Sequence, residues 1–191
     1  MRRGQEEVLF QSAELSTPLC PSDISPHLRG EGYKKNMIDE CCKILSAAEW
    51  DKKEIVWRDK PFLKSHYFAF LHVPVNIGAK IAEGMKKIEE AGLGAEQMML
   101  SKNDGLFGAD ILIPIKTKTN NFEVELITGR FLTRLFDGHY GDMRKWIRET
   151  RIWCRGKGLE PEEFIFWYAT CPKCSKKRGD KAQVVVFAKV E

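Results

Sequence analysis

The sequence has no apolar run approaching the roughly eighteen residues that a membrane-spanning helix needs. Its first residues include two arginines but no apolar stretch of the kind found in secretory signals, so we expect a cytoplasmic protein without a membrane partner. It also has no dense block of basic residues beyond CSKKRGDK at 174–181, and its net charge is only +4. Nucleic-acid binding is therefore not expected, and no cofactor is predicted.

The cysteines lack the spacing of a strong metal site. The six are Cys20, Cys41, Cys42, Cys154, Cys171 and Cys174. Scattered cysteines in a chain without a secretory signal predict reduced thiols. Cys41 and Cys42 fall on an apolar stripe, and we interpret them as buried thiols, because small thiols pack as hydrophobic groups.

Cys171 and Cys174 form a single Cys-x-x-Cys pair that can be interpreted in three ways. Structural zinc takes four ligands, and the candidates to complete the set, Cys154 and His139, lack matching spacing. A redox dithiol would open a helix after a strand, whereas a lysine-rich turn and a further strand are expected here. We favour ordinary turn residues and predict no metal site, with zinc and redox chemistry as the alternatives.

Two regions differ in composition. Residues 1–32 carry three prolines and no sustained periodicity, which predicts a flexible N-terminal arm. Residues 33–191 alternate between apolar stripes at helical spacing and short alternating runs, which predicts one α+β domain. Helices are expected at 34–45, 77–92 and 140–158, and strands at 53–62, 65–75, 96–104, 109–117, 121–138 (two strands around Thr128-Gly129), 162–170 and 182–190.

An internal repeat organises these elements. Shifting the chain by 66 residues places Gly92-Leu93 on Gly158-Leu159 and Ile81 on Ile147. We therefore expect duplicated strand-helix-strand-strand units, repeat one at about 55–118 and repeat two at about 121–191. They should form an antiparallel sheet with helices on one face and a ligand groove between the repeats.

The segment FDGHYGDMRKWIRETRIWCRGKGLEPEEFIFWYATCP, residues 136–172, resembles the second half of the GyrI-like (gyrase-inhibitor-like) small-molecule-binding family. The matching positions are Gly138, Tyr140, Trp146, Gly158, Leu159, Tyr168 and Pro172. The resemblance implies an effector- or multidrug-binding domain with the duplicated layout described above. Many members carry a glutamate two positions before the tyrosine; here that position is Phe166, unless Glu123 or Glu125 substitutes for it.

The alternating aromatic run FIFWYAT supplies the candidate groove residues. Phe166 and Tyr168 lie on one face and Trp167 on the other, and an open aromatic face suits a planar hydrophobic ligand. Together with the resemblance, this predicts a ligand-binding set of Phe70, His72, Glu123, Glu125, Tyr140, Phe166 and Tyr168.

The predicted function is binding of small planar hydrophobic compounds, including cationic ones. The alternative is a hydrolase acting on strained or electrophilic small molecules in the same groove, because some relatives in the resembled superfamily are hydrolases. Such chemistry needs a positioned acid or base, and the catalytic candidates are Glu125 and Tyr168.

Overall fold

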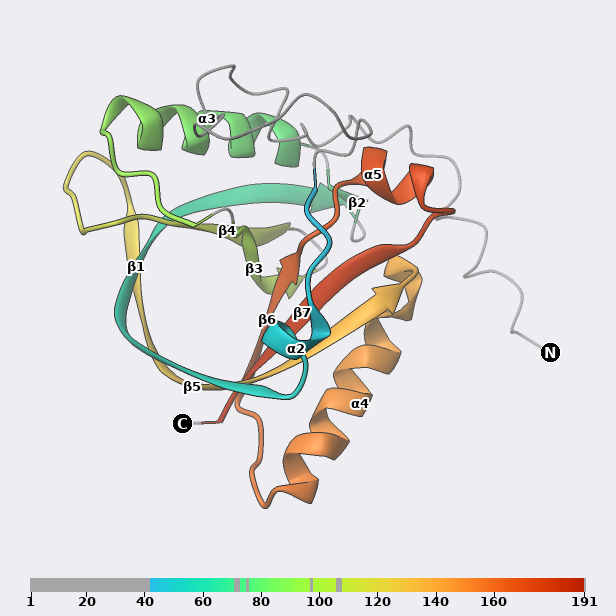
Figure 1. Cartoon of the computed structure of the whole chain (residues 1–191). Coiled ribbons are helices and arrows are strands. Elements are labelled where there is room, and N and C mark those ends of the chain that lie inside the picture. The colour runs from blue at the N-terminus through green and yellow to red at the C-terminus, as the bar shows by residue number, and fades with distance from the viewer. Residues whose placement is uncertain (1–41, 71–72, 75, 97, 106–107, 191) are drawn as a thin grey trace.

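The computed structural model describes residues 42–70, 73–74, 76–96, 98–105 and 108–190 (Figure 1). The predicted arm at 1–32 lies outside them, as does most of the predicted helix at 34–45. The described part of that helix is not helical: Ser46 is extended, and the first described helix is α2 (Ala47–Trp50). The reason is that the Leu45 amide donates to the side-chain oxygen of Gln183 at 2.7 Å, and the Leu45 carbonyl accepts from the Gln183 amide nitrogen at 3.3 Å.

The fold is α+β, as predicted, but its antiparallel sheet is closed. The strands are β1 (Lys53–Phe70), β2 (Val73–Pro74), β3 (Leu100–Gly105), β4 (Gly108–Pro114), β5 (Val124–Gly138), β6 (Glu163–Tyr168) and β7 (Ala182–Lys189). They run in the order β2-β1-β4-β3-β6-β7-β5, and a further pairing of β1 with β5 closes six of them into a barrel. Short β2 pairs with the end of β1.

The two longer helices pack on the outside of this barrel (Figure 1). They are α3 (Ile77–Glu90), which buries Ile81 and Ile88 against β1 and β4, and α4 (Met143–Gly156), which buries Trp146 and Cys154 against β5 and β7. The 3-10 turn η2 (Tyr140–Asp142) precedes α4, and the short α5 (Pro172–Lys177) follows β6. The order strand, helix, strand, strand occurs in both halves, while the duplication and the repeat boundaries stay predictions. Within the described residues, no helix has the length and apolarity to cross a membrane.

The strands β1 and β5 are each continuous where two strands were predicted. In β1 the register shifts between Trp57 and Lys60, and Asp59 has a φ of 48°, so the strand bends without ending. Pro61 stays within this strand, and its carbonyl accepts from the Ile115 amide at 3.1 Å. In β5, Gly129 has a φ of 155° and lies opposite Trp57, so both strands bend at the same level. These bends let two long strands curve round the barrel.

Most of the barrel interior is occupied by one apolar cluster. Its buried members are Trp57, Phe62, Met98, Leu100, Leu112, Ile127, Phe131, Ile165, Trp167, Val185 and Phe187. In β6, Ile165 and Trp167 belong to this cluster, whereas Phe166 and Tyr168 pack in a separate cluster beneath α4. Closure of the sheet therefore gives β6 two buried faces, and only the face with Trp167 looks into the barrel.

The start of β4 depends on a glycine. A Cβ built on Gly108 would lie 2.1 Å from the Tyr67 carbonyl oxygen, and its φ is 148°. We expect Gly108→Ala to lower the free energy of unfolding by about 2 kcal/mol or more. Gly156→Ala is the control, because nothing lies within 4 Å of its Cβ position and alanine favours the helix. Urea unfolding measures both, and similar midpoints for the two variants would contradict the expected clash.

Candidate functional site

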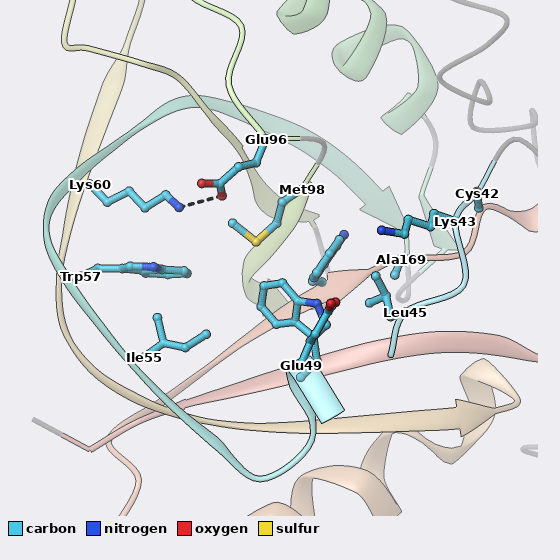
Figure 2. A pocket seen from close by; sticks show the side chains of 12 residues that line it. Cys42, Lys43, Leu45, Glu49, Ile55, Trp57, Lys60, Glu96, Met98 and Ala169 are labelled. Atoms are coloured by element: carbon cyan, nitrogen blue, oxygen red, sulfur yellow. Dashed lines mark hydrogen bonds and ion pairs between the residues drawn. The ribbon is translucent and has the colours of Figure 1, made fainter. Parts of the chain in front are cut away.

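A cavity of about 530 Å³ lies between the interior of the barrel and the segment 42–50. It is lined by Cys42, Lys43, Leu45, Glu49, Trp50, Ile55, Trp57, Lys60, Glu96, Met98, Trp167 and Ala169 (Figure 2). A cavity of this size suits a small organic molecule. Segment 42–50 lies outside the barrel strands, so this wall of the cavity is supplied by a separate part of the chain.

Three tryptophans form the apolar walls. The Trp50 and Trp167 rings meet edge to face with centroids 4.9 Å apart. Trp57 packs on Phe131 at 4.8 Å and on Phe187 at 5.3 Å, so its ring is fixed by the interior cluster. Rigid, flat walls favour a planar hydrophobic ligand, because little side-chain freedom is lost when it binds.

The polar edge of the cavity is an ion pair. Lys60 Nζ donates to Glu96 Oε2 at 2.8 Å, drawn as a dashed line in Figure 2. The same ammonium lies 5.3 Å from the centroid of the Trp57 ring, which adds a cation–π attraction. The Glu96 side chain is 64% exposed, so the pair adds little to folding stability. The Lys60 ammonium and the Glu96 carboxylate thus lie beside an apolar wall and are accessible to solvent.

The predicted aromatic residues come together, but not at this cavity. Phe166 and Tyr168 pack beneath α4 with Tyr140, whose hydroxyl donates to the Thr170 carbonyl. Burial raises the pKa of Tyr140 well above its usual value. The predicted alternation along β6 is correct, and Phe166 and Tyr168 lie on its outward face. The cavity uses the opposite face, which carries Trp167. A ligand-binding role for these three residues stays a prediction.

Of the other predicted site residues, Phe70 ends β1, where it pairs with Val73, and His72 lies outside the described residues. Glu123 is 70% exposed and lies 3.8 Å from Lys64. Glu125 points into the barrel, opposite Phe62, but does not line the cavity.

Glu125 belongs to a charged cluster inside the barrel. Its carboxylate accepts from Lys102 Nζ at 2.7 Å and lies 3.4 Å from Lys64 Nζ. Lys102 is also 3.4 Å from Glu163, and Lys64 is 3.6 Å from Asp110. Because β3 and β5 are not neighbours in the sheet, the Lys102–Glu125 bond crosses the barrel interior.

These contacts define the charge states of the cluster. Burial lowers the pKa of Lys102, but the hydrogen bond to Glu125 and the charges of Glu163 and Glu125 raise it overall. Burial likewise lowers the pKa of Lys64, and the nearby carboxylates raise it above its usual value. Both lysines are therefore cations at neutral pH. Glu125 pairs with both of them, and its predicted catalytic role stays a prediction.

Three cysteines also come together. The Sγ atoms of Cys42, Cys171 and Cys174 lie within 4.8 Å of one another. Cys171 and Cys174 were predicted to be turn residues; instead Cys171 caps α5 and Cys174 lies in its first turn, because Pro172 suits the first helical position. Cys42 was missed as their neighbour, since it lies 129 residues away from Cys171 and its spacing had suggested a helix. The adjacent cysteines Cys41 and Cys42 are the one feature of the sequence that could have pointed to Cys42 as a member of this cluster.

Cys42 lines the cavity but is a poor nucleophile there. Burial is the largest of the effects that raise the pKa of its thiol to about 12. The thiol is therefore protonated at neutral pH, and only the thiolate is strongly nucleophilic.

The barrel, its aromatic cavity and the ion pair at its edge define a small α+β protein with a cavity lined by tryptophans. The chain belongs to a family described as bacterial hydrolase, whose model matches residues 33–190. This match overturns the resemblance to the GyrI-like family and, with it, the expected multidrug-binding domain. No curated protein matches the sequence.

The Lys102–Glu125 bond should stabilise the barrel measurably. Lys102→Met removes the cation from two carboxylates whose side chains are 21% and 29% exposed, so we expect a loss of about 1–3 kcal/mol in urea unfolding. Lys86→Met is the matched control, because Lys86 and Glu90 are both well exposed at 3.8 Å. It should change stability by less than about 0.5 kcal/mol. Equal losses of unfolding free energy in the two variants would show that the Lys102–Glu125 bond stabilises the fold no more than an exposed ion pair does.

Ligand binding should depend on the tryptophan walls. With 1-naphthol as a planar probe, tryptophan fluorescence should saturate, and Trp50→Leu should weaken binding about tenfold by removing one wall. Trp153→Leu is the control, because Trp153 lies on α4 in another cluster. Tyr168→Phe should bind like the wild type. A loss in Tyr168→Phe equal to that in Trp50→Leu would favour the outer aromatic cluster as the binding site.

Proposed function

We propose that the protein is a hydrolase that acts on small electrophilic substrates carrying a planar hydrophobic group. The observation that carries this proposal is the presence of three tryptophan walls and the Lys60–Glu96 ion pair around one cavity. Membership in the bacterial hydrolase family supports hydrolysis over binding alone. The tryptophans would hold the planar group, and the reactive bond would lie at the polar edge.

Glu96 is the proposed general base. One of its oxygens accepts from Lys60, which orients the carboxylate and leaves the other oxygen to accept from a water molecule. Glu96 would take a proton from this water as the water oxygen bonds to the electrophilic carbon. The carboxyl group would then return the proton to the leaving group, so the side chain ends the cycle as it began.

Lys60 is the proposed stabiliser of the negative charge that develops on the substrate. Its ammonium is held beside the Trp57 and Phe62 rings, at 5.3 Å and 6.0 Å from their centroids. A cation fixed against an apolar wall interacts more strongly with a developing oxyanion than a fully hydrated one. Its side chain is 23% exposed, which limits competition from water.

Glu49 is the second carboxylate at the cavity. It comes from α2 and lies apart from the Lys60–Glu96 pair in Figure 2. Within the described residues no ion pair orients Glu49, so Glu96 is the better base. Separate substitution of the two residues distinguishes them.

Hydrolysis of 1-naphthyl acetate, followed by naphthol release, tests the proposal. Glu96→Gln should lower kcat about 10²- to 10⁴-fold with little change in KM, because the amide cannot accept the proton. Glu49→Gln should have a smaller effect. Glu90→Gln on the outer surface of α3 is the matched control and should retain full activity.

Two results would contradict the mechanism. An unchanged kcat in Glu96→Gln would exclude that residue as the base. Saturable binding of the probe without turnover of naphthyl esters of different acyl length would leave the cavity as a binding site for planar hydrophobic compounds, which was the main prediction from the sequence.

A further inference from the structure

The three clustered thiols lie in the geometry of an incomplete metal shell. Cys42, Cys171 and Cys174 have mutual Sγ separations within 4.8 Å. Four sulfurs around a tetrahedral zinc at about 2.3 Å lie about 3.8 Å apart, so small side-chain rotations would bring these three to a common ion. Two come from one turn of chain, and the third comes from a segment remote in sequence, as in many structural metal sites.

The backbone around the cluster already orients sulfur atoms. The Cys171 amide donates to Cys42 Sγ at 3.2 Å, and the Cys174 amide donates to Cys171 Sγ at 3.5 Å. Amide donors of this kind stabilise the negative charge that a ligating sulfur carries. The site is therefore more than a chance approach of three side chains: two of its sulfurs accept hydrogen bonds from the backbone that presents the others.

We infer that Cys42, Cys171 and Cys174 bind a thiophilic metal ion of the Zn²⁺ class. Thiolate ligands select Zn²⁺ over Mg²⁺ and Ca²⁺, which prefer oxygen. Three sulfurs from the described part of the chain leave one position in a tetrahedral shell for water or a further ligand. The site goes beyond the proposed hydrolysis, whose groups are Lys60 and Glu96, and neither inference depends on the other.

The ion would have a structural consequence for the cavity. Cys42 begins segment 42–50, which supplies Leu45, Glu49 and Trp50 to the cavity wall. Cys171 lies two residues after Ala169, which lines the same cavity at the end of β6. A metal bound to all three cysteines would fasten this wall to the barrel, together with the Leu45–Gln183 hydrogen bonds.

Metal binding can be measured without any assay of activity. Reduced, metal-free protein should bind one equivalent of Zn²⁺ in competition with a chromophoric chelator. Co²⁺ should give the thiolate charge-transfer absorption and the intense visible bands of a tetrahedral sulfur site. Cys42→Ser, Cys171→Ser and Cys174→Ser should each lower the Zn²⁺ affinity at least about 100-fold.

Cys154→Ser is the matched control, because Cys154 is a buried thiol in the cluster beneath α4. Cys154→Ser should still bind one equivalent of Zn²⁺. Added Zn²⁺ should raise the urea midpoint of Cys154→Ser and of the wild type, and should leave the midpoint of Cys174→Ser unchanged. The inference is overturned if the wild type takes up no Zn²⁺ under reducing conditions. It is equally overturned if Co²⁺ shows no thiolate absorption, or if Cys154→Ser loses as much affinity as the other variants.

Discussion

The pairing of β1 with β5 is the constraint on which the rest of the structure depends. Without it the strands would form an open sheet with one face covered by α3 and α4 and the other exposed. With it the second face becomes the inside of a barrel, where an apolar cluster packs beside a cluster of paired charges. The closure requires both strands to bend, and the register shift after Trp57 and the adjacent Gly129 provide that bend at one level.

The aromatic cavity and the charged cluster are two separate parts of the barrel. Around the cavity, tryptophan rings are fixed by their neighbours and a single ion pair lies at the edge. In the charged cluster, Lys64 and Lys102 are neutralised by carboxylates from several strands. A charge left unpaired at such a place would be costly, so this cluster is best understood as structural. The groups proposed to react, Lys60 and Glu96, are instead at the edge of the cavity, where the Glu96 side chain is exposed.

Much of the local structure could be predicted from the sequence, and the site could not. The helices at 77–92 and 140–158 followed from apolar spacing, and their glycine stops have φ of 65° at Gly92 and 75° at Gly158. The alternation in β6 was also correct. Which face of β6 lines the cavity depends on the closure of the sheet, and alternation alone does not say which face that is. Trp50 and Cys42 were missed because their roles arise from contacts with residues more than a hundred positions away.

The attachment of Leu45 to Gln183 shows how an extra segment can join a closed barrel. The strands around the ring satisfy one another, so segment 42–50 is held instead by a side-chain amide that imitates the backbone of a neighbouring strand. This contact holds Leu45, and the Thr133 hydroxyl of β5, which donates to the Trp50 carbonyl at 2.8 Å, holds the end of the segment. Substitutions between these two points would therefore change the lining of the cavity, while the strands that maintain the fold stay as they are.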